Sequence, residues 1–350
     1  MARLRFTALV FFTLVVTAKS LDYEEEKPEV VLVHGSCLGA WNWFKVQAAL
    51  EDKGYKVTAL DLLGMGRDRT PVDQITSVAM FAKPLTDYLA SVPNKVILVG
   101  HSLGGVSISF AMELLPQKVS KAVFVTACMP RNNQSALDTF PPDLFPGLVS
   151  SGVVIINFGN GPNSLPTSFS VSSSIAEIIN NESPKELVDL ELSLLGSNPY
   201  APLVEPLILT KEKYGSIRRF YIVAGKDHLF FPDIYQKPLI EASGPVEQVF
   251  YVKGGDHCVF FSKPKELTEL LIPELLVNIR RADPYVVVTY DGRKAPGAKS
   301  VQTKAIVRNG TNIFTFLSEM ETRQQSIRKQ DGPVKAVQHS KLFGTKHPRT

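Results

Sequence analysis

A serine between two glycines stands where the sequence predicts that a strand gives way to a helix. The pentapeptide Gly100-His101-Ser102-Leu103-Gly104 directly follows the apolar run Lys95–Val99. In a sharp strand-to-helix turn of this G-x-S-x-G type, small neighbours let the strand and the helix approach each other, and the serine hydroxyl is exposed above the sheet. The pattern therefore predicts Ser102 as a nucleophile.

A serine hydroxyl is a weak nucleophile near neutral pH, so a base must take its proton and a carboxylate should orient that base. In chains with this turn, the partners follow in the order Asp or Glu, then His. Asp227 comes just after the β-rich run Arg218–Val223, and His257 comes just after the run Glu247–Val252. We therefore expect a catalytic triad of Ser102, Asp227 and His257.

Five other residues compete for these roles: His228, Asp233 and Asp256 neighbour the chosen pair, and His34 and His101 flank glycines elsewhere. We interpret Asp233 as a cap residue of the helix that follows Pro232, because Asp227 lies nearer the strand end. Asp256 is interpreted as a turn former, since side chains at consecutive positions of an extended turn diverge. His101 is expected to pack at the strand-to-helix turn.

A tetrahedral intermediate also needs donors for its oxyanion, usually two backbone N–H groups. One should come from Leu103, the residue after the nucleophile. The other should come from the glycine-containing loop after the first strand, 34–39, where the N–H of Ser36 is the candidate.

Short β-rich runs alternate with helix-like segments along most of the chain, which predicts an α/β fold with a mostly parallel sheet and helices on both faces. The expected strands are Glu29–His34, Lys56–Leu60, Lys95–Val99, Lys121–Ala127, Arg218–Val223 and Glu247–Val252. The expected helices are Trp41–Lys53, Thr76–Ser91, Ser102–Leu115, Asp233–Ala242 and Pro264–Ala282.

Residues 131–215 interrupt this alternation with a long segment rich in Pro, Ser, Asn and Leu. A structureless loop of this length is improbable in a compact domain, so we expect a partly helical cap over the carboxyl edge of the sheet, where open α/β folds bind ligands. Apolar side chains of this cap would shape an acyl pocket, for example Phe140, Leu144, Phe145 and Phe158.

Overall composition excludes several classes of protein. The chain has 38 Lys and Arg against 34 Asp and Glu, a net charge of +4, which gives no nucleic-acid signature. Its three cysteines, Cys37, Cys128 and Cys258, are too few for a disulfide scaffold. Because no CxxC or His/Cys cluster has metal-ligand spacing, no structural zinc is expected. The serine mechanism itself needs no metal or redox cofactor.

Both ends of the chain differ from the body at 26–282. Met1–Ser20 has two early arginines, a 13-residue apolar run and small residues at its end, which is typical of a cleaved signal peptide and too short for a stable membrane span. Residues 283–350 are basic and have little periodic apolar content, which predicts a disordered tail. Three Asn-x-Ser/Thr sequons, at Asn133, Asn181 and Asn309, are compatible with a secretory route.

Several colinear segments of the body resemble the plant methylesterases of the α/β-hydrolase superfamily. This group includes salicylic-acid-binding methyl salicylate esterases and the related hydroxynitrile lyases. The segments are VLVHGSCLGAWNWFKV, GYKVTALDLLGMG, VILVGHSLGG, ACMP, TKEKYGSIRRFYIV and KGGDHCVFFSKPKEL, within residues 29–282. The resemblance implies an α/β-hydrolase fold and places Ser102, Asp227 and His257 on the family triad, with Ser36 and Leu103 on its oxyanion-hole positions.

Two departures from the lyases follow from the same resemblance. The lyases have a threonine after the first motif histidine and a lysine after the catalytic histidine, where this chain has Gly35 and Cys258. The resemblance therefore implies an esterase. A third departure is Leu38, where relatives often have histidine, so the pocket floor should differ.

The function expected from these observations is a serine carboxylesterase for methyl esters of small carboxylic acids, such as methyl indole-3-acetate, methyl jasmonate or methyl salicylate. The alternatives are a hormone-binding protein on a hydrolase scaffold and a hydroxynitrile lyase. The stretches FGNGPNSLPTSF and HCVFFSKP resemble a plastid-targeted subgroup, but only 28 residues precede the first expected strand. The expected location is the secretory pathway or the extracellular space, with plastid or cytoplasm as alternatives, and the oligomeric state is open.

Overall fold

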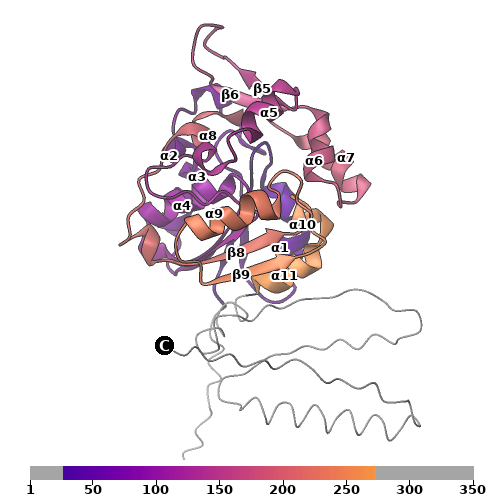
Figure 1. Cartoon of the computed structure of the whole chain (residues 1–350). Coiled ribbons are helices and arrows are strands. Elements are labelled where there is room, and N and C mark those ends of the chain that lie inside the picture. The colour runs from indigo at the N-terminus through magenta and orange to yellow at the C-terminus, as the bar shows by residue number, and fades with distance from the viewer. Residues whose placement is uncertain (1–26, 273–350) are drawn as a thin grey trace, which may run out of the picture. The chain divides into compact units, whose positions relative to one another are not determined.

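Six parallel strands form the central sheet of the computed structural model, which describes residues 27–272. The strand order is β2-β1-β3-β4-β8-β9, so the chain starts inside the sheet and builds outwards to both edges (Figure 1). The strands are β1 (Val30–Val33), β2 (Val57–Leu60), β3 (Val96–His101), β4 (Val119–Val125), β8 (Arg218–Ala224) and β9 (Gln248–Val252). The predicted α/β-hydrolase fold is confirmed, and each of these strands begins within two residues of its expected start.

The strands are apolar on both faces because helices cover both. All four residues of β1 are fully buried, and Val31 and Val33 belong to the large core cluster that also contains residues of α3 and α4. A strand buried in this way must consist of apolar residues without alternation. This is the pattern from which the sequence predicted the sheet.

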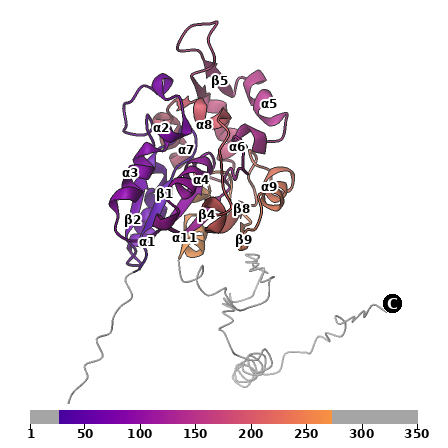
Figure 2. The same ribbon diagram turned by 90° about the vertical axis from the view of Figure 1, so that its left-hand side faces the viewer.

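Helices α1 and α11 contact each other on one face of the sheet, and α2, α3, α4 and α9 contribute to the core on the other face (Figure 2). The helices of the body are α1 (Phe44–Glu51), α2 (Val78–Phe81), α3 (Lys83–Ser91), α4 (Gly104–Leu114), α9 (Lys237–Ala242), α10 (Val259–Ser262) and α11 (Pro264–Leu271). Short 3-10 turns are η1 (Ala40–Trp43), η2 (Val72–Gln74), η3 (Pro116–Lys118) and η6 (Tyr214–Ser216), and η7 (Pro232–Gln236) is a π-helical turn.

The helix expected over 76–91 is divided at Ala82. Pro84 occupies the first turn of α3, where its missing N–H costs nothing, whereas a continuous helix would lose a hydrogen bond there. The sequence pattern showed the apolar periodicity but not this break.

Residues 131–215 form a cap at one end of the main sheet, which Figure 1 shows around the labels α5, β5 and β6. The cap is partly helical, as expected. It also contains a three-stranded antiparallel sheet in the order β5-β6-β7, which was not expected. Its elements are η4 (Leu137–Thr139), α5 (Leu144–Ser150), β5 (Val154–Asn157), β6 (Ser168–Val171), η5 (Ser173–Ile175), α6 (Ala176–Ile179), α7 (Lys185–Leu194), β7 (Asn198–Pro199) and α8 (Ala201–Val204).

Three expectations concern residues that lie outside the described range. These are the signal segment Met1–Ser20, the end of the last expected helix at 273–282, and the basic tail at 283–350. Within 27–272, no helix is both long and apolar enough to span a membrane.

Candidate active site

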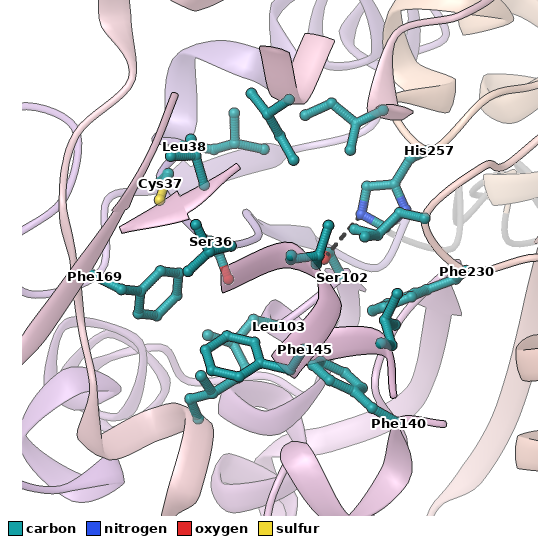
Figure 3. Close-up of a pocket in the computed structure, with 18 of the residues that line it drawn as sticks. Ser36, Cys37, Leu38, Ser102, Leu103, Phe140, Phe145, Phe169, Phe230 and His257 are labelled. Atoms are coloured by element: carbon teal, nitrogen blue, oxygen red, sulfur yellow. Dashed lines mark hydrogen bonds between the residues drawn. The ribbon is translucent and has the colours of Figure 1, made fainter. Parts of the chain in front are cut away.

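Ser102 lies on the turn between β3 and α4, in a backbone conformation that non-glycine residues rarely adopt. Its φ is +51°, and its Oγ points into a pocket (Figure 3). The turn can be this sharp because Gly104 has no side chain, and a Cβ there would lie only 2.5 Å from the carbonyl oxygen of His34. Strain of this kind persists where surrounding packing enforces it, and it is common at reactive residues.

The three residues expected to form a triad are brought together by the fold. His257 Nδ1 lies 2.9 Å from Asp227 Oδ2, and His257 Nε2 lies 3.0 Å from Ser102 Oγ. Since the carboxylate can only accept, Nδ1 carries the proton and Nε2 is left to accept from the serine hydroxyl. All three side chains are buried, with Asp227 fully so.

Asp227 is held as a carboxylate by its neighbours. Burial alone would raise the pKa of this carboxyl, but the adjacent His257 and the hydrogen bonds that it accepts outweigh burial and hold its pKa below the usual range. Oδ1 accepts from the backbone N–H groups of Leu229, at 2.8 Å, and Phe230, at 2.7 Å, while Oδ2 also accepts from the hydroxyl of Thr126. A fixed negative charge behind the imidazole is therefore available at neutral pH.

Two backbone N–H groups face the same pocket. Ser36 and Leu103 both line it, and within residues 27–272 neither N–H donates to a protein acceptor. The loop that carries Ser36 is fixed by His34, whose Nε2 accepts from Leu62 N at 3.0 Å and whose Nδ1–H donates to Gly35 O at 2.8 Å. Burial lowers the pKa of His34, so this histidine remains neutral and structural.

His101 does more than pack at the turn. Its Nε2–H donates to the backbone carbonyl of His257 at 2.9 Å, and its ring lies 4.8 Å from the His257 ring. Burial lowers its pKa well below the usual range, and the neighbouring His257 adds to this shift. The only feature of the sequence that indicated this contact with His257 is the position of His101 beside Ser102.

The two competing aspartates are placed apart from the reacting atoms. Asp233 is exposed and pairs with Lys237, and it does not cap the helix as expected, because it lies inside the π-helical turn η7. Asp256 is fully buried and accepts hydrogen bonds from Ser183 Oγ at 2.8 Å and Ser262 Oγ at 2.7 Å. Asp256 was expected only to form a turn. Its carboxylate also joins Ser183 of the cap to Ser262 of the body.

The pocket above Ser102 is apolar beyond its catalytic end. Figure 3 shows Phe145 and Phe169 on the far side of Ser102 from His257, whereas the Phe140 ring lies 5.4 Å from that of Phe230. Leu144 also lines the pocket, but Phe158 does not, since its side chain is 44% exposed on the β5–β6 hairpin.

The cysteines lie near the site without forming bonds to each other. Cys37, Cys128 and Cys258 are free and buried, and burial raises the pKa of the first two to about 12. No group of three or more His, Cys, Asp or Glu side chains within 27–272 is arranged to hold a metal ion.

Fold and site together define a protein with the architecture and the Ser-His-Asp arrangement of an α/β hydrolase. The sequence profile described as the alpha/beta hydrolase family matches residues 30–270. The chain belongs to this family and, within it, to the plant methylesterase group.

Three similar proteins illustrate that membership. Putative methylesterase 11 of Arabidopsis thaliana is 43% identical over 250 residues, which are 71% of this chain and 64% of that protein. Methyl jasmonate esterase 1 of Vitis vinifera is 39% identical over 259 residues, covering 71% of this chain and 97% of the relative. The crystal structure of polyneuridine aldehyde esterase has a TM-score of 0.64 and 32% identity over 71% of this chain and 99% of that one. The match spans only 64% of methylesterase 11 and 56% of putative methylesterase 15, so it leaves a large part of those relatives uncovered.

The expected secretory or extracellular location is wrong. Putative methylesterases 11 to 15 of Arabidopsis thaliana are all named chloroplastic. The early arginines of Met1–Ser20 and its lack of acidic residues also occur in plastid transit segments, so these two features did not separate the two destinations. The sequon at Asn181 gives no support either, because its Nδ2 donates to Lys226 O at 3.0 Å and its Ser183 is bonded to Asp256.

The two positions that separate esterases from lyases are both tightly packed. A Cβ at Gly35 would lie 2.7 Å from Ser102 Cβ and 2.9 Å from His101 Nδ1, so this structure has no room for a threonine there. Cys258 is fully buried, and its thiol lies 3.8 Å from Glu191 Oε1. Neither position supplies a hydroxyl or a cation to the pocket.

Proposed function

We propose that the chain is a serine carboxylesterase that hydrolyses methyl esters of small carboxylic acids through an acyl-enzyme. The observation that carries the proposal is the hydrogen-bonded chain from Asp227 through His257 to Ser102 Oγ at the end of an apolar pocket. Relatives named as methylesterases, and one named as a methyl jasmonate esterase, support the choice of ester.

In the first half of the reaction, Ser102 Oγ attacks the ester carbonyl carbon while its proton moves to His257 Nε2. The carbonyl electrons collect on oxygen, and the N–H groups of Ser36 and Leu103 stabilise that charge. His257 then gives its proton to the methoxy oxygen, so that methanol leaves and the acyl group remains on Ser102.

In the second half, His257 takes a proton from water, whose oxygen attacks the acyl carbon. The proton then returns to Ser102 as the carboxylic acid is released. Asp227 holds the imidazole in the Nδ1–H form throughout and stabilises the imidazolium, which its lowered pKa allows because it stays ionised.

The lining of the pocket suits an apolar acyl group. Its polar side chains, on Ser36, Ser102, His101 and His257, all belong to the catalytic end, while the remaining lining is apolar apart from the thiol of Cys37. A hydroxyl or amine buried among the phenylalanines would lose its hydrogen bonds to water, at about 1–3 kcal/mol for each unpaired group. Acyl groups that are mostly hydrocarbon or aromatic are therefore favoured over acyl groups with several hydroxyl or amine groups.

The decisive experiment measures acid release by the purified full chain from a panel of methyl esters, including methyl indole-3-acetate, methyl jasmonate and methyl salicylate. Wild type should release acid from at least one, and Ser102→Ala should remove nearly all of that activity. Ser91→Ala, which changes a serine at the exposed end of α3, is the matched control and should leave it unchanged.

Two other outcomes would point to the alternatives. A hormone-binding protein would retain affinity for the free acids, measured by calorimetry, while wild type releases no acid from any ester. A hydroxynitrile lyase would release cyanide from mandelonitrile, which the packing at Gly35 and the buried thiol of Cys258 argue against.

We further propose that the protein acts in plastids, as the names of putative methylesterases 11 to 15 suggest for those relatives. A fluorescent protein fused to the C-terminus of the full chain should coincide with chlorophyll fluorescence in leaf cells. A fusion that fills the cytosol instead would contradict this location.

A further inference from the structure

The cap makes hydrogen bonds to the residues on both sides of His257. On one side, Asp256 Oδ2 accepts from Glu182 N at 2.9 Å and from Ser183 Oγ at 2.8 Å. On the other side, Cys258 N donates to the carbonyl oxygen of Ile179 at 3.1 Å. The residues immediately before and after His257 are therefore both bonded to one segment of the cap, residues 179–191, which we call the cap latch.

A buried carboxyl extends this contact. Glu191 is 1% exposed, its Oε2 accepts from Asn180 Nδ2 at 3.0 Å, and its Oε1 faces the thiol of Cys258 at 3.8 Å. Burial raises the pKa of Glu191 to about 7. Glu191, Asn180 and Cys258 are all buried, so the cap latch packs directly against the loop that carries His257.

The latch also contacts the residue before the triad aspartate. Asn181 Nδ2 donates to the carbonyl oxygen of Lys226 at 3.0 Å, and the Lys226 ammonium pairs with Glu182 at 3.0 Å. One short cap segment thus contacts the immediate sequence neighbours of both Asp227 and His257.

The same segment forms part of the acyl pocket. The side chain of Ile179 lines the pocket, while its carbonyl oxygen holds Cys258. A displacement of the latch would therefore move the pocket wall and the imidazole together. Because a misplacement of about 1 Å at a reacting group can cost a hundredfold in rate, small shifts would matter.

We propose that the cap latch positions His257, with Ser183 and Asp256 as the principal pair of positioning residues, so that closure of the cap around the acyl group also sets the base. This inference rests on the proposed function, in which His257 is that base. It predicts that catalysis depends on the hydrogen bond from Ser183 Oγ to Asp256, although Ser183 neither lines the pocket nor bonds to a triad residue.

The test compares Ser183→Ala, Ser183→Thr and Ser174→Ala in the full chain with a methyl ester that wild type hydrolyses. Ser183→Ala should lower kcat about tenfold or more and change KM less, because it removes a hydrogen bond to Asp256 but keeps the one from Cys258 N to Ile179 O at the pocket wall. Ser183→Thr keeps a hydroxyl and should restore most of kcat. Ser174 is exposed on the same cap, and among residues 27–272 its Oγ is bonded only to Ser172 Oγ, so Ser174→Ala should match wild type.

A role confined to cap stability would lower the thermal midpoint of Ser183→Ala and leave its kcat at 25 °C unchanged, and that result would overturn the inference. Equal loss in Ser183→Thr would overturn it as well, since the hydroxyl would then be irrelevant.

A spectroscopic readout separates this inference from the proposed function. The Nδ1–H proton of His257, bonded to Asp227, gives a low-field proton NMR resonance that needs no turnover. Ser183→Ala should shift or broaden this resonance, and Ser174→Ala should not. Absence of ester turnover in wild type would reject the proposed function, whereas an unchanged resonance in Ser183→Ala would reject the positioning role.

Discussion

His257 Nε2 lies 3.0 Å from Ser102 Oγ, although 155 positions separate the two residues in the chain. Ser102 follows β3, in the interior of the sheet, and His257 follows β9 at its edge. The imidazole reaches inward because the residues after β9 return over the carboxyl edge before α10 begins. This contact requires that β3 and β9 both occupy their places in the sheet.

Replacing Asp227 with asparagine should lower kcat by on the order of 10⁴ while the protein remains folded. The amide can donate to Nδ1 and so favours the wrong tautomer, in which Nε2 no longer accepts from Ser102. The measurement is ester turnover at pH 7, accompanied by circular dichroism to show that the fold is kept.

Asp233→Asn provides the control for that variant, because Asp233 is exposed and, within residues 27–272, its carboxylate pairs only with Lys237. It should retain wild-type kcat. Equal losses in the two variants would remove Asp227 from the mechanism.

Gly35→Ala should lower kcat by on the order of 100-fold, because the added Cβ would lie 2.7 Å from Ser102 Cβ and must push the nucleophile away. Gly147→Ala in α5 is a matched control, since a Cβ there meets nothing within 4 Å. The control should be as active as wild type and up to about 1 kcal/mol more stable. Full activity in Gly35→Ala would show that the nucleophile tolerates displacement.

Most of the main sheet could be predicted because its strands obey a local rule. Runs such as Val30–Val33, which forms β1, are apolar on both faces, and most of them are followed by a helix-like segment. Ser102, Asp227 and His257 could be predicted to lie close together because each follows such a run, and parallel strands bring their carboxyl ends to one edge. The exact side-chain partners, such as the donor from Thr126 to Asp227, depend on tertiary contacts that leave no local pattern.

Glu191→Gln should remove a pH dependence of stability. The folded protein keeps the Glu191 proton up to about pH 7, whereas the unfolded chain loses it near pH 4.3. Between these values the folded state binds more protons, so the free energy of unfolding of wild type falls as the pH rises through this window. Relative to Glu191→Gln, wild type should lose up to about 3 kcal/mol between pH 4.5 and 7.5.

Urea titrations of both proteins at several pH values measure this difference, and comparison of the two cancels the titration of all other groups. A difference that is constant with pH would mean that Glu191 is ionised in the folded state across the range, which would contradict the dry packing inferred for the cap latch.

Phe145→Ala should raise KM for methyl esters with aromatic acyl groups and change it little for methyl acetate, because Phe145 lines the pocket and packs edge-to-face on Phe169, with 6.4 Å between the ring centroids. Phe158→Ala removes a phenylalanine from the same cap but outside the pocket, and it should leave both KM values unchanged. A similar effect of both variants would indicate a general loosening of the cap in place of a specific acyl contact.

The cap was the least predictable part of the protein for a physical reason. Strands β5 (VIIN) and β6 (SFSV) are only four residues each, too short for their apolar pattern to distinguish a strand from the surrounding loops. Phe158 follows β5 directly and was expected in the pocket, but the β5–β6 hairpin turns it towards solvent. Asp256 was read as a turn former because its partner Ser183 lies 73 positions away, at a distance that no local motif reveals.

The central claim is that the His257 imidazole makes the Ser102 hydroxyl a nucleophile, and covalent labelling tests it most directly. A fluorophosphonate forms a bond from Ser102 Oγ to phosphorus as fluoride leaves, with His257 accepting the serine proton. Peptide mass mapping of the labelled full chain should find the phosphonyl group on Ser102 in wild type, none in Ser102→Ala, and much slower labelling in His257→Ala. Labelling of another residue, or an unchanged rate in His257→Ala, would contradict the account.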